Sequence, residues 1–368
     1  MSITPEPPLK TCEGRLKHGS ILNGNIRLPR VSSQWKSTAI GFAHDASLAF
    51  AVDEPVVNDG HHDLAVTTLC ETEAFFAPLL PAEPIYQDEN RVVFESDIKT
   101  SDEKNNVFEC VVTESGAKDH ALVVFHHWYS RNRYPAFSKY FARRGMTVVE
   151  ATLPYHFSRG SNDCSEEQFF NASVGRTLRS MRQAVLDGRK IVRWLKGQRY
   201  RTISVVGMCL GGTVAGLVAA QEERVDKAVL MVTPPSPADL IWTSETMQRL
   251  KGRIEPFMSL EDLRKAWTLI DLDMHTFWLS RPELELLFVQ GKRDTIARPD
   301  EAHHLIHELT SLRGRPPELL QLNCGHSSIG MFPYNIIAAR KVLRFLMEIP
   351  TLKELWEVRN FRIDLSGV

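Results

Sequence analysis

Strand signals and helix signals alternate along most of this chain, and this alternation limits the possible folds more than any other feature. Short continuous apolar runs are typical of strands buried on both faces of a sheet, and the segments between them carry apolar residues at helical spacing. A parallel sheet wrapped by helices has this pattern, so we predict an α/β protein. The expected strands are 121–125, 146–153, 202–207, 226–233, 283–291 and 316–323, and the clearest helices are 135–144 and 174–196.

The remaining regions predict how the chain is organised. Residues 91–96 and 107–115 alternate apolar and polar side chains, which predicts an antiparallel hairpin. Residues 1–90 have no regular pattern, and we expect an N-terminal extension packed on a main domain of residues 91–368. Within that domain, residues 236–282 replace the alternation with helical material rich in large apolar side chains, which we expect to form a cap insertion.

A glycine-rich turn joins the expected strand 202–207 to a helix of small residues. Its sequence is Gly207-Met208-Cys209-Leu210-Gly211-Gly212. A nucleophile held on a sharp turn between strand and helix needs glycine on both sides, because a Cβ there would collide with the neighbouring elements. The N-terminus of the following helix favours the thiolate form of a cysteine. We interpret Cys209 as a nucleophile; the alternative is a buried structural cysteine.

Two later turns supply an acid and a base in the expected order. Asp294 follows the expected strand 283–291, and His326 follows the expected strand 316–323. A thiol has little thiolate at neutral pH and needs a base within hydrogen-bond reach, which His326 would provide. Asp294 would hold the imidazole in the correct tautomer, although it could instead only cap the helix that begins near Pro299.

Attack by Cys209 would create an oxyanion that needs preorganised backbone donors. One donor should be the amide of Leu210, directly after the nucleophile. The second should come from the loop after strand 121–125, where His127 and Trp128 are both candidates.

The region from about Asp119 to Pro350, with these motifs, resembles the α/β-hydrolase superfamily. The cysteine at the elbow resembles the branch that contains dienelactone hydrolases, whose elbow is G-x-C-x-G-G, and polyhydroxyalkanoate synthases. The resemblance implies an α/β-hydrolase fold, a mostly parallel central sheet flanked by helices, and cleavage of an ester, lactone or thioester through a Cys-His-Asp triad and an acyl-cysteine intermediate.

Two other functions remain open. Ala228 to Pro234 is similar to the synthase pattern, so an acyltransferase with an acyl-CoA donor is an alternative, although the synthase segment P-x-I-N-K-x-Y is absent. A non-catalytic binding protein with the same fold is the other alternative, and the intact order of the three residues argues against it. The phrases Leu153-Pro154-Tyr155-His156 and Cys324-Gly325-His326 look like those of bacterial α/β hydrolases that usually carry serine at the elbow.

The composition of the expected cap suggests the kind of substrate. Its tryptophans and other apolar side chains are too many for a purely solvated surface, so we expect a pocket for an apolar acyl group or an aromatic ester or lactone. The expected pocket residues are Met208, His156, Trp242, Trp267 and Trp278.

Composition and charge exclude other classes of partner. With 44 Lys+Arg against 45 Asp+Glu in 368 residues, the chain has no cationic surplus for nucleic acid, and we expect a small-molecule partner. The uncharged stretch 202–220 contains glycines that suit a strand, turn and helix better than a membrane span. Six scattered cysteines and the absence of a secretory signal predict reduced thiols in the cytoplasm. No cofactor or metal is expected, since His303, His304 and His307 lack an accompanying carboxylate motif.

Overall fold

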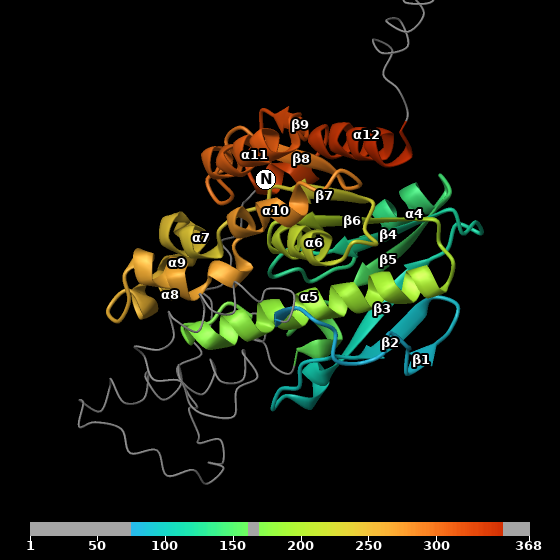
Figure 1. Cartoon of the computed structure of the whole chain (residues 1–368), viewed down its shortest axis with the longest axis horizontal. Coiled ribbons are helices and arrows are strands. Elements are labelled where there is room, and N and C mark those ends of the chain that lie inside the picture. Colours follow the sequence, from blue (N-terminus) through green and yellow to red (C-terminus); the bar gives the residue numbers. More distant parts are fainter. Residues whose placement is uncertain (1–74, 161–168, 349–368) are drawn as a thin grey trace, which may run out of the picture.

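The computed structural model describes residues 75–160 and 169–348, and within them nine strands form one sheet with helices on both faces (Figure 1). The order across the sheet is β1-β2-β3-β5-β4-β6-β7-β8-β9. Every strand expected from an apolar run is present. The strands are β1 (Tyr86–Gln87), β2 (Arg91–Glu95), β3 (Val107–Thr113), β4 (His120–Phe125), β5 (Met146–Ala151), β6 (Thr202–Met208), β7 (Lys227–Met231), β8 (Glu285–Gly291) and β9 (Glu318–Leu322).

The sheet is parallel except at one edge. β5, β4, β6, β7, β8 and β9 pair in parallel, with Val123 opposite Val205 in the centre. β1, β2 and β3 pair antiparallel, and β2 and β3 form the predicted hairpin with Arg91 opposite Val111. This mostly parallel sheet flanked by helices confirms the predicted α/β-hydrolase fold class.

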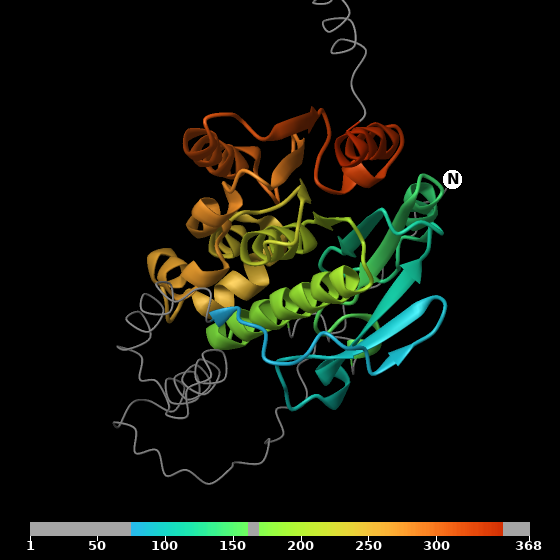
Figure 2. The same ribbon diagram turned by 45° about the vertical axis from the view of Figure 1, so that its right-hand side comes forward.

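Each face of the sheet has its own apolar core. On one face, α5 (Val174–Gly197), α6 (Leu210–Gln221) and α11 (Pro299–Arg313) pack on the strands through side chains such as Leu178 and Val214. On the other face, α4 (Pro135–Ala142) and α12 (Tyr334–Met347) pack through Phe141 and Val342 (Figures 1 and 2). Since these helices follow strands whose carboxyl ends share one edge, the connecting turns meet there.

The predicted helix 174–196 is α5, and side chains on its polar side are buried as well as those on its apolar side. Arg182, Asp187 and Lys190 are buried because the hairpin and the chain before it cover this side of the helix. Arg182 Nε donates to the carbonyl of Phe75 at 2.7 Å, and Asp187 Oδ2 accepts from the buried Arg159 at 2.8 Å. The long helix is therefore enclosed nearly all round.

Short helices occupy the insertion at 236–282. They are α7 (Pro237–Thr243), α8 (Gln248–Ile254), α9 (Leu260–Ala266) and α10 (Thr276–Leu279), with 3₁₀ turns between them. Figure 1 shows α7, α8 and α9 together at one end of α5, and α10 beside α6. The indole N–H of Trp267 donates to the carbonyl of Val174 at 3.0 Å, which attaches this group to the start of α5.

The expected N-terminal extension, 1–90, lies largely outside the described residues. In its described part, Phe75 and Phe76 are buried in the core, and β1 pairs with β2. The sheet therefore begins before residue 91.

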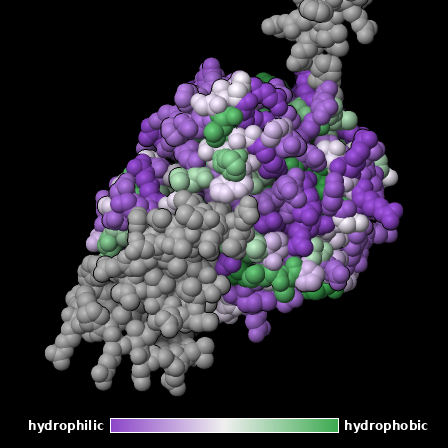
Figure 3. Space-filling view, viewed as in Figure 1, coloured by the Kyte–Doolittle hydropathy of each residue, from purple (hydrophilic) through white to green (hydrophobic). Residues whose placement is uncertain are grey.

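The uncharged stretch 202–220 is divided at Cys209 into β6 and α6. Among the helices of residues 75–160 and 169–348, none combines the length and the apolar character needed to span a membrane. On the face seen in Figure 3, hydrophilic side chains dominate outside the grey region, and hydrophobic ones form small groups among them.

Candidate active site

Cys209 lies in a strained turn at the carboxyl end of β6, one residue before α6. Its φ is 54° and its ψ is −121°, a region that non-glycine residues rarely adopt. A Cβ on Gly207 would lie 1.9 Å from the carbonyl oxygen of Gly211, and a Cβ on Gly211 would lie 2.2 Å from that of Phe125. The amide of Cys209 donates to the carbonyl of Met231 at 2.9 Å, which fixes the turn to β7. The glycines thus serve the purpose that the sequence suggested.

Asp294 and His326 meet beside this turn. Asp294 follows β8, and His326 follows β9. His326 Nδ1 donates to Asp294 Oδ2 at 2.8 Å. The other carboxylate oxygen of Asp294 accepts from the amides of Ile296 and Ala297, each at 2.9 Å. The carboxylate therefore braces its own loop and orients the imidazole at once.

The third member of the group is in contact with the imidazole. Burial disfavours the charged ring, but hydrogen bonds to Asp294 and to Cys209 outweigh it and raise the pKa of His326 to about 10. A protonated imidazole next to sulfur stabilises a thiolate. The arrangement can therefore present a charged nucleophile and a proton donor side by side.

A histidine and a tyrosine from the loop after β4 complete the surroundings. The hydroxyl of Tyr134 and Nδ1 of His127 share a hydrogen bond of 2.5 Å. Burial lowers the pKa of His127, and the charge of His326 adds to this effect. Burial also raises the pKa of Tyr134, and the charge of Cys209 contributes. Tyr134 was missed in the sequence, where it was one aromatic residue among several in 128–141.

The expected oxyanion donors lie at suitable places in the fold. Leu210 is the first residue of α6, so its amide has no acceptor within the helix. His127 and Trp128 are in the loop after β4. The main chain of Phe125, at the end of that strand, is so close to Gly211 that there is no space for a Cβ there. Which of the two amides would face an oxyanion stays a prediction.

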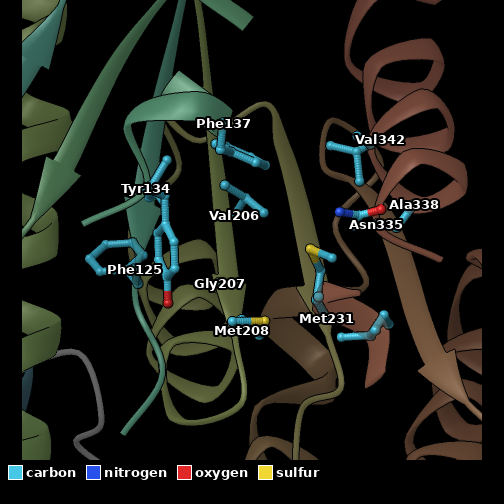
Figure 4. Close-up of a pocket in the computed structure, with 14 residues that line it drawn as sticks. Phe125, Tyr134, Phe137, Val206, Gly207, Met208, Met231, Asn335, Ala338 and Val342 are labelled. Carbon is cyan, nitrogen blue, oxygen red and sulfur yellow. The ribbon is translucent and has the colours of Figure 1, made fainter. Parts of the chain in front are cut away.

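A cavity of about 260 Å³ opens beside the elbow on the face covered by α4 and α12. Figure 4 shows Tyr134 and Phe137 on one side, Val206, Gly207 and Met208 on β6, and Asn335, Ala338 and Val342 from α12 on the other side. None of the 14 described residues that line it is charged. It is lined by Val124, Phe125, Tyr134, Phe137, Val206, Gly207, Met208, Met231, Ile329, Gly330, Asn335, Ala338, Ala339 and Val342.

Of the five expected pocket residues, only Met208 lines this cavity. His156 is buried against His126, with ring centroids 4.7 Å apart. Trp267 is 1% exposed and packs in the core on the α5 side, and Trp242 and Trp278 are partly buried against the same core. The three tryptophans of the insertion thus pack against the core on the side of α5 and α6, and no described residue of 236–282 borders the cavity.

The fold and the cysteine elbow define a protein with the α/β-hydrolase fold. More narrowly, residues 108–259, which include the elbow, match the dienelactone hydrolase family model.

Solved structures share the fold at low sequence identity. The acetyl xylan esterase from Paenibacillus sp. R4 aligns with a TM-score of 0.54 and 14% identity, over 82% of this chain and 98% of that one. The Pyrococcus horikoshii acylaminoacyl peptidase aligns with a TM-score of 0.55 and 14% identity, over 74% of this chain and 42% of that one.

Two sequence relatives are uncharacterized proteins of Mycobacterium tuberculosis, from strains CDC 1551 and H37Rv. Each is 32% identical over 130 residues, which cover 35% of this chain. The aligned part spans 28% of the length of those relatives.

Proposed function

We propose that this protein is a carboxylic ester hydrolase that cleaves an ester, lactone or thioester of a small molecule, with Cys209, His326 and Asp294 as its catalytic triad. The observation that carries the proposal is the strained turn of Cys209 beside an imidazole that is hydrogen-bonded to Asp294 at 2.8 Å. The match to the dienelactone hydrolase family supports it.

In the first half-reaction, Sγ of Cys209 would attack the carbonyl carbon, and the carbonyl π electrons would move to oxygen. The amide of Leu210 and one amide of the loop at 127–128 would stabilise this oxyanion. The oxyanion would then re-form the carbonyl and expel the alcohol or thiol, which takes its proton from His326. An acyl-cysteine remains.

In the second half-reaction, His326 would accept a proton from water as the water attacks the acyl carbon. Collapse of this second intermediate releases the carboxylic acid and restores Cys209. An alcohol in place of water would give acyl transfer instead, so the acceptor alone separates hydrolysis from transfer.

Alkylation tests the nucleophile before any substrate is known. Cys110 and Cys324 are buried, and burial raises the pKa of both thiols, whereas Cys209 is partly exposed. We expect iodoacetamide to modify Cys209 in the native protein faster than either, with the sites read by mass spectrometry. Equal rates at Cys209 and Cys324 would contradict an activated thiol.

Ester turnover tests the reaction. Cys209→Ala should lower the rate with p-nitrophenyl butyrate by about 10³-fold or more, because the triad acts as a unit. Cys110→Ala in β3 is the matched control and should keep the activity. Retained turnover in Cys209→Ala would exclude the nucleophile, and an ester product formed from added alcohol without free acid would establish acyl transfer.

We also propose that the protein works in a reducing compartment such as the cytoplasm. Cys110, Cys209 and Cys324 all carry free thiols in the described residues.

A further inference from the structure

The cavity between α4 and α12 adjoins the proposed catalytic groups at three points. Met208, in its wall, directly precedes Cys209. Ile329, also in the wall, belongs to the 3₁₀ turn Ser327–Gly330 that follows His326. Tyr134, a third wall residue, is hydrogen-bonded to His127. The cavity is therefore lined by residues of the same turns that carry Cys209 and His326.

The walls suit an uncharged chain. Apart from the hydroxyl of Tyr134 and the amide of Asn335, the side chains of its described lining residues are apolar, including those of Met208, Met231 and Phe137. In Figure 4 the hydroxyl of Tyr134 points to the end of the cavity where Gly207 and Met208 lie. The polar atom thus lies near the reacting centre, and the apolar walls extend away from it.

Two exposed apolar side chains belong to the short chain segment between two lining residues of the cavity. Gly330 and Asn335 are lining residues that reach the surface, and Met331 and Phe332 lie between them in the chain. Met331 is 60% exposed and Phe332 is 82% exposed. Large apolar side chains that are exposed to water are typical of a surface that binds an apolar ligand.

We propose that this cavity holds the acyl chain of the substrate, so that the enzyme prefers medium-length, uncharged acyl groups. This rests on the proposed ester hydrolysis at Cys209. A cavity of about 150 Å³ already holds benzene, so a volume of about 260 Å³ has room for an acyl chain of roughly six to eight carbons. The acyl site thus lies between α4 and α12, on the face opposite α5 and α6.

The closing experiment compares two alanine-to-phenylalanine changes. Ala339 is a partly exposed lining residue on α12, whereas Ala136 is exposed on α4 and outside the cavity. With p-nitrophenyl esters from acetyl to octanoyl, we expect kcat/KM of the wild type to rise by about three- to fourfold per methylene up to a length limit. Ala339→Phe should lower the octanoyl-to-acetyl ratio at least tenfold, and Ala136→Phe should leave it unchanged.

A binding measurement separates this proposal from the reaction itself. Octanoate is titrated into the full-length Cys209→Ala chain, with and without Ala339→Phe, by calorimetry. If Ala339→Phe weakens octanoate binding at least tenfold, the result supports the cavity as the acyl site. This holds even if no ester is hydrolysed, and then only the proposed hydrolysis is contradicted. Ester turnover with a length profile that Ala339→Phe does not alter overturns the acyl site and leaves hydrolysis standing.

Discussion

The protonation state of His326 determines how the candidate site responds to pH. Its pKa in the folded protein is about 10, above the ordinary value of 6.5, because hydrogen bonds to Asp294 and Cys209 outweigh burial. A raised pKa means that its pairing stabilises the fold fully below about pH 6.5, and that this contribution is lost as the pH rises through about 10. The imidazole is therefore a proton donor throughout the neutral range.

Asp294→Asn should shift the alkaline limb of activity. The wild-type rate should hold until the pH approaches 10, because the leaving group takes its proton from His326. Loss of the carboxylate charge should move that limb down by about one pH unit or more and lower kcat. The measurement is kcat/KM against pH for both proteins. An alkaline limb at the same pH in both would show that Asp294 does not set the charge of His326.

Tyr134→Phe should impair the reaction more than it impairs folding. Without the hydroxyl, the half-buried His127 loses its 2.5 Å partner, a change worth about 1 to 2 kcal/mol, or roughly tenfold in kcat. Tyr140→Phe on α4, outside the site, is the control. Urea unfolding distinguishes a role in the reaction from a role in folding. If the loss in the free energy of unfolding equals the loss in transition-state stabilisation, Tyr134 is a structural residue only.

The positions of Cys209, Asp294 and His326 at strand ends could be predicted from the sequence because each residue follows its own recognisable strand. The glycines around Cys209 carry a strong local signal, and the order nucleophile, acid, base has few alternatives. The pair of His127 and Tyr134 carries no such signal, since it depends on how the loop after β4 folds back. Long-range packing, which no local pattern encodes, brings Tyr134 near Cys209.

At the scale of elements, the main chain at the start of α6 lies very close to the end of β4. A Cβ on Gly211 would lie 2.2 Å and 2.5 Å from the carbonyl oxygens of Phe125 and His126. Main-chain atoms cannot rotate away as a side chain can. Any side chain here must push the loop after β4 from the start of α6.

Gly211→Ala should therefore destabilise the fold by about 1 to 3 kcal/mol and lower kcat, since the shifted loop also carries the proposed second oxyanion donor. Gly252→Ala in α8 is the matched control, because nothing lies within 4 Å of the added Cβ. That change should stabilise the helix by about 0.5 to 1 kcal/mol. Urea midpoints measure both. Equal effects of the two changes would contradict the close approach.

The insertion shows what composition alone does not determine. The helical character of 236–282 followed from its sequence, and α7 to α10 are present. The expected use of its tryptophans in a substrate pocket assumed that they face the elbow. A segment rich in large apolar side chains can line a pocket or fill a core, and its composition is the same in both cases. The direction in which the side chains pack distinguishes the two, and Trp267 is buried against the start of α5.

For the whole molecule, buried ions connect the antiparallel edge of the sheet to the helical layer. Arg159 is 1% exposed and donates to Asp187, to the carbonyl of Thr152 and to that of Asn105. Asp187 on α5 also accepts from Ser96 after β2. The charge of Asp187 on α5 is thus paired with residues outside the helix, and only the tertiary structure reveals these partners.

Asp187→Ala should cost about 3 to 5 kcal/mol, because it leaves the guanidinium of Arg159 buried without its counterion. Lys99→Ala, which breaks the exposed pair of Lys99 with Glu95, should change stability by less than about 1 kcal/mol. Chemical denaturation of both variants gives the comparison. A cost below about 1 kcal/mol for Asp187→Ala would mean that water reaches Arg159.

The distribution of the proposed triad over three strand ends has a consequence for the folding of the chain. Cys209, Asp294 and His326 follow β6, β8 and β9, and no two of them share a local element. Parallel strands pair through long crossovers, which close slowly. In the proposed triad, the thiol gains its base only when β9, the last strand in the described residues, is in place, so a chain that is still folding would carry an unactivated cysteine. The time at which alkylation of Cys209 becomes fast during refolding should therefore mark the time at which the sheet is complete.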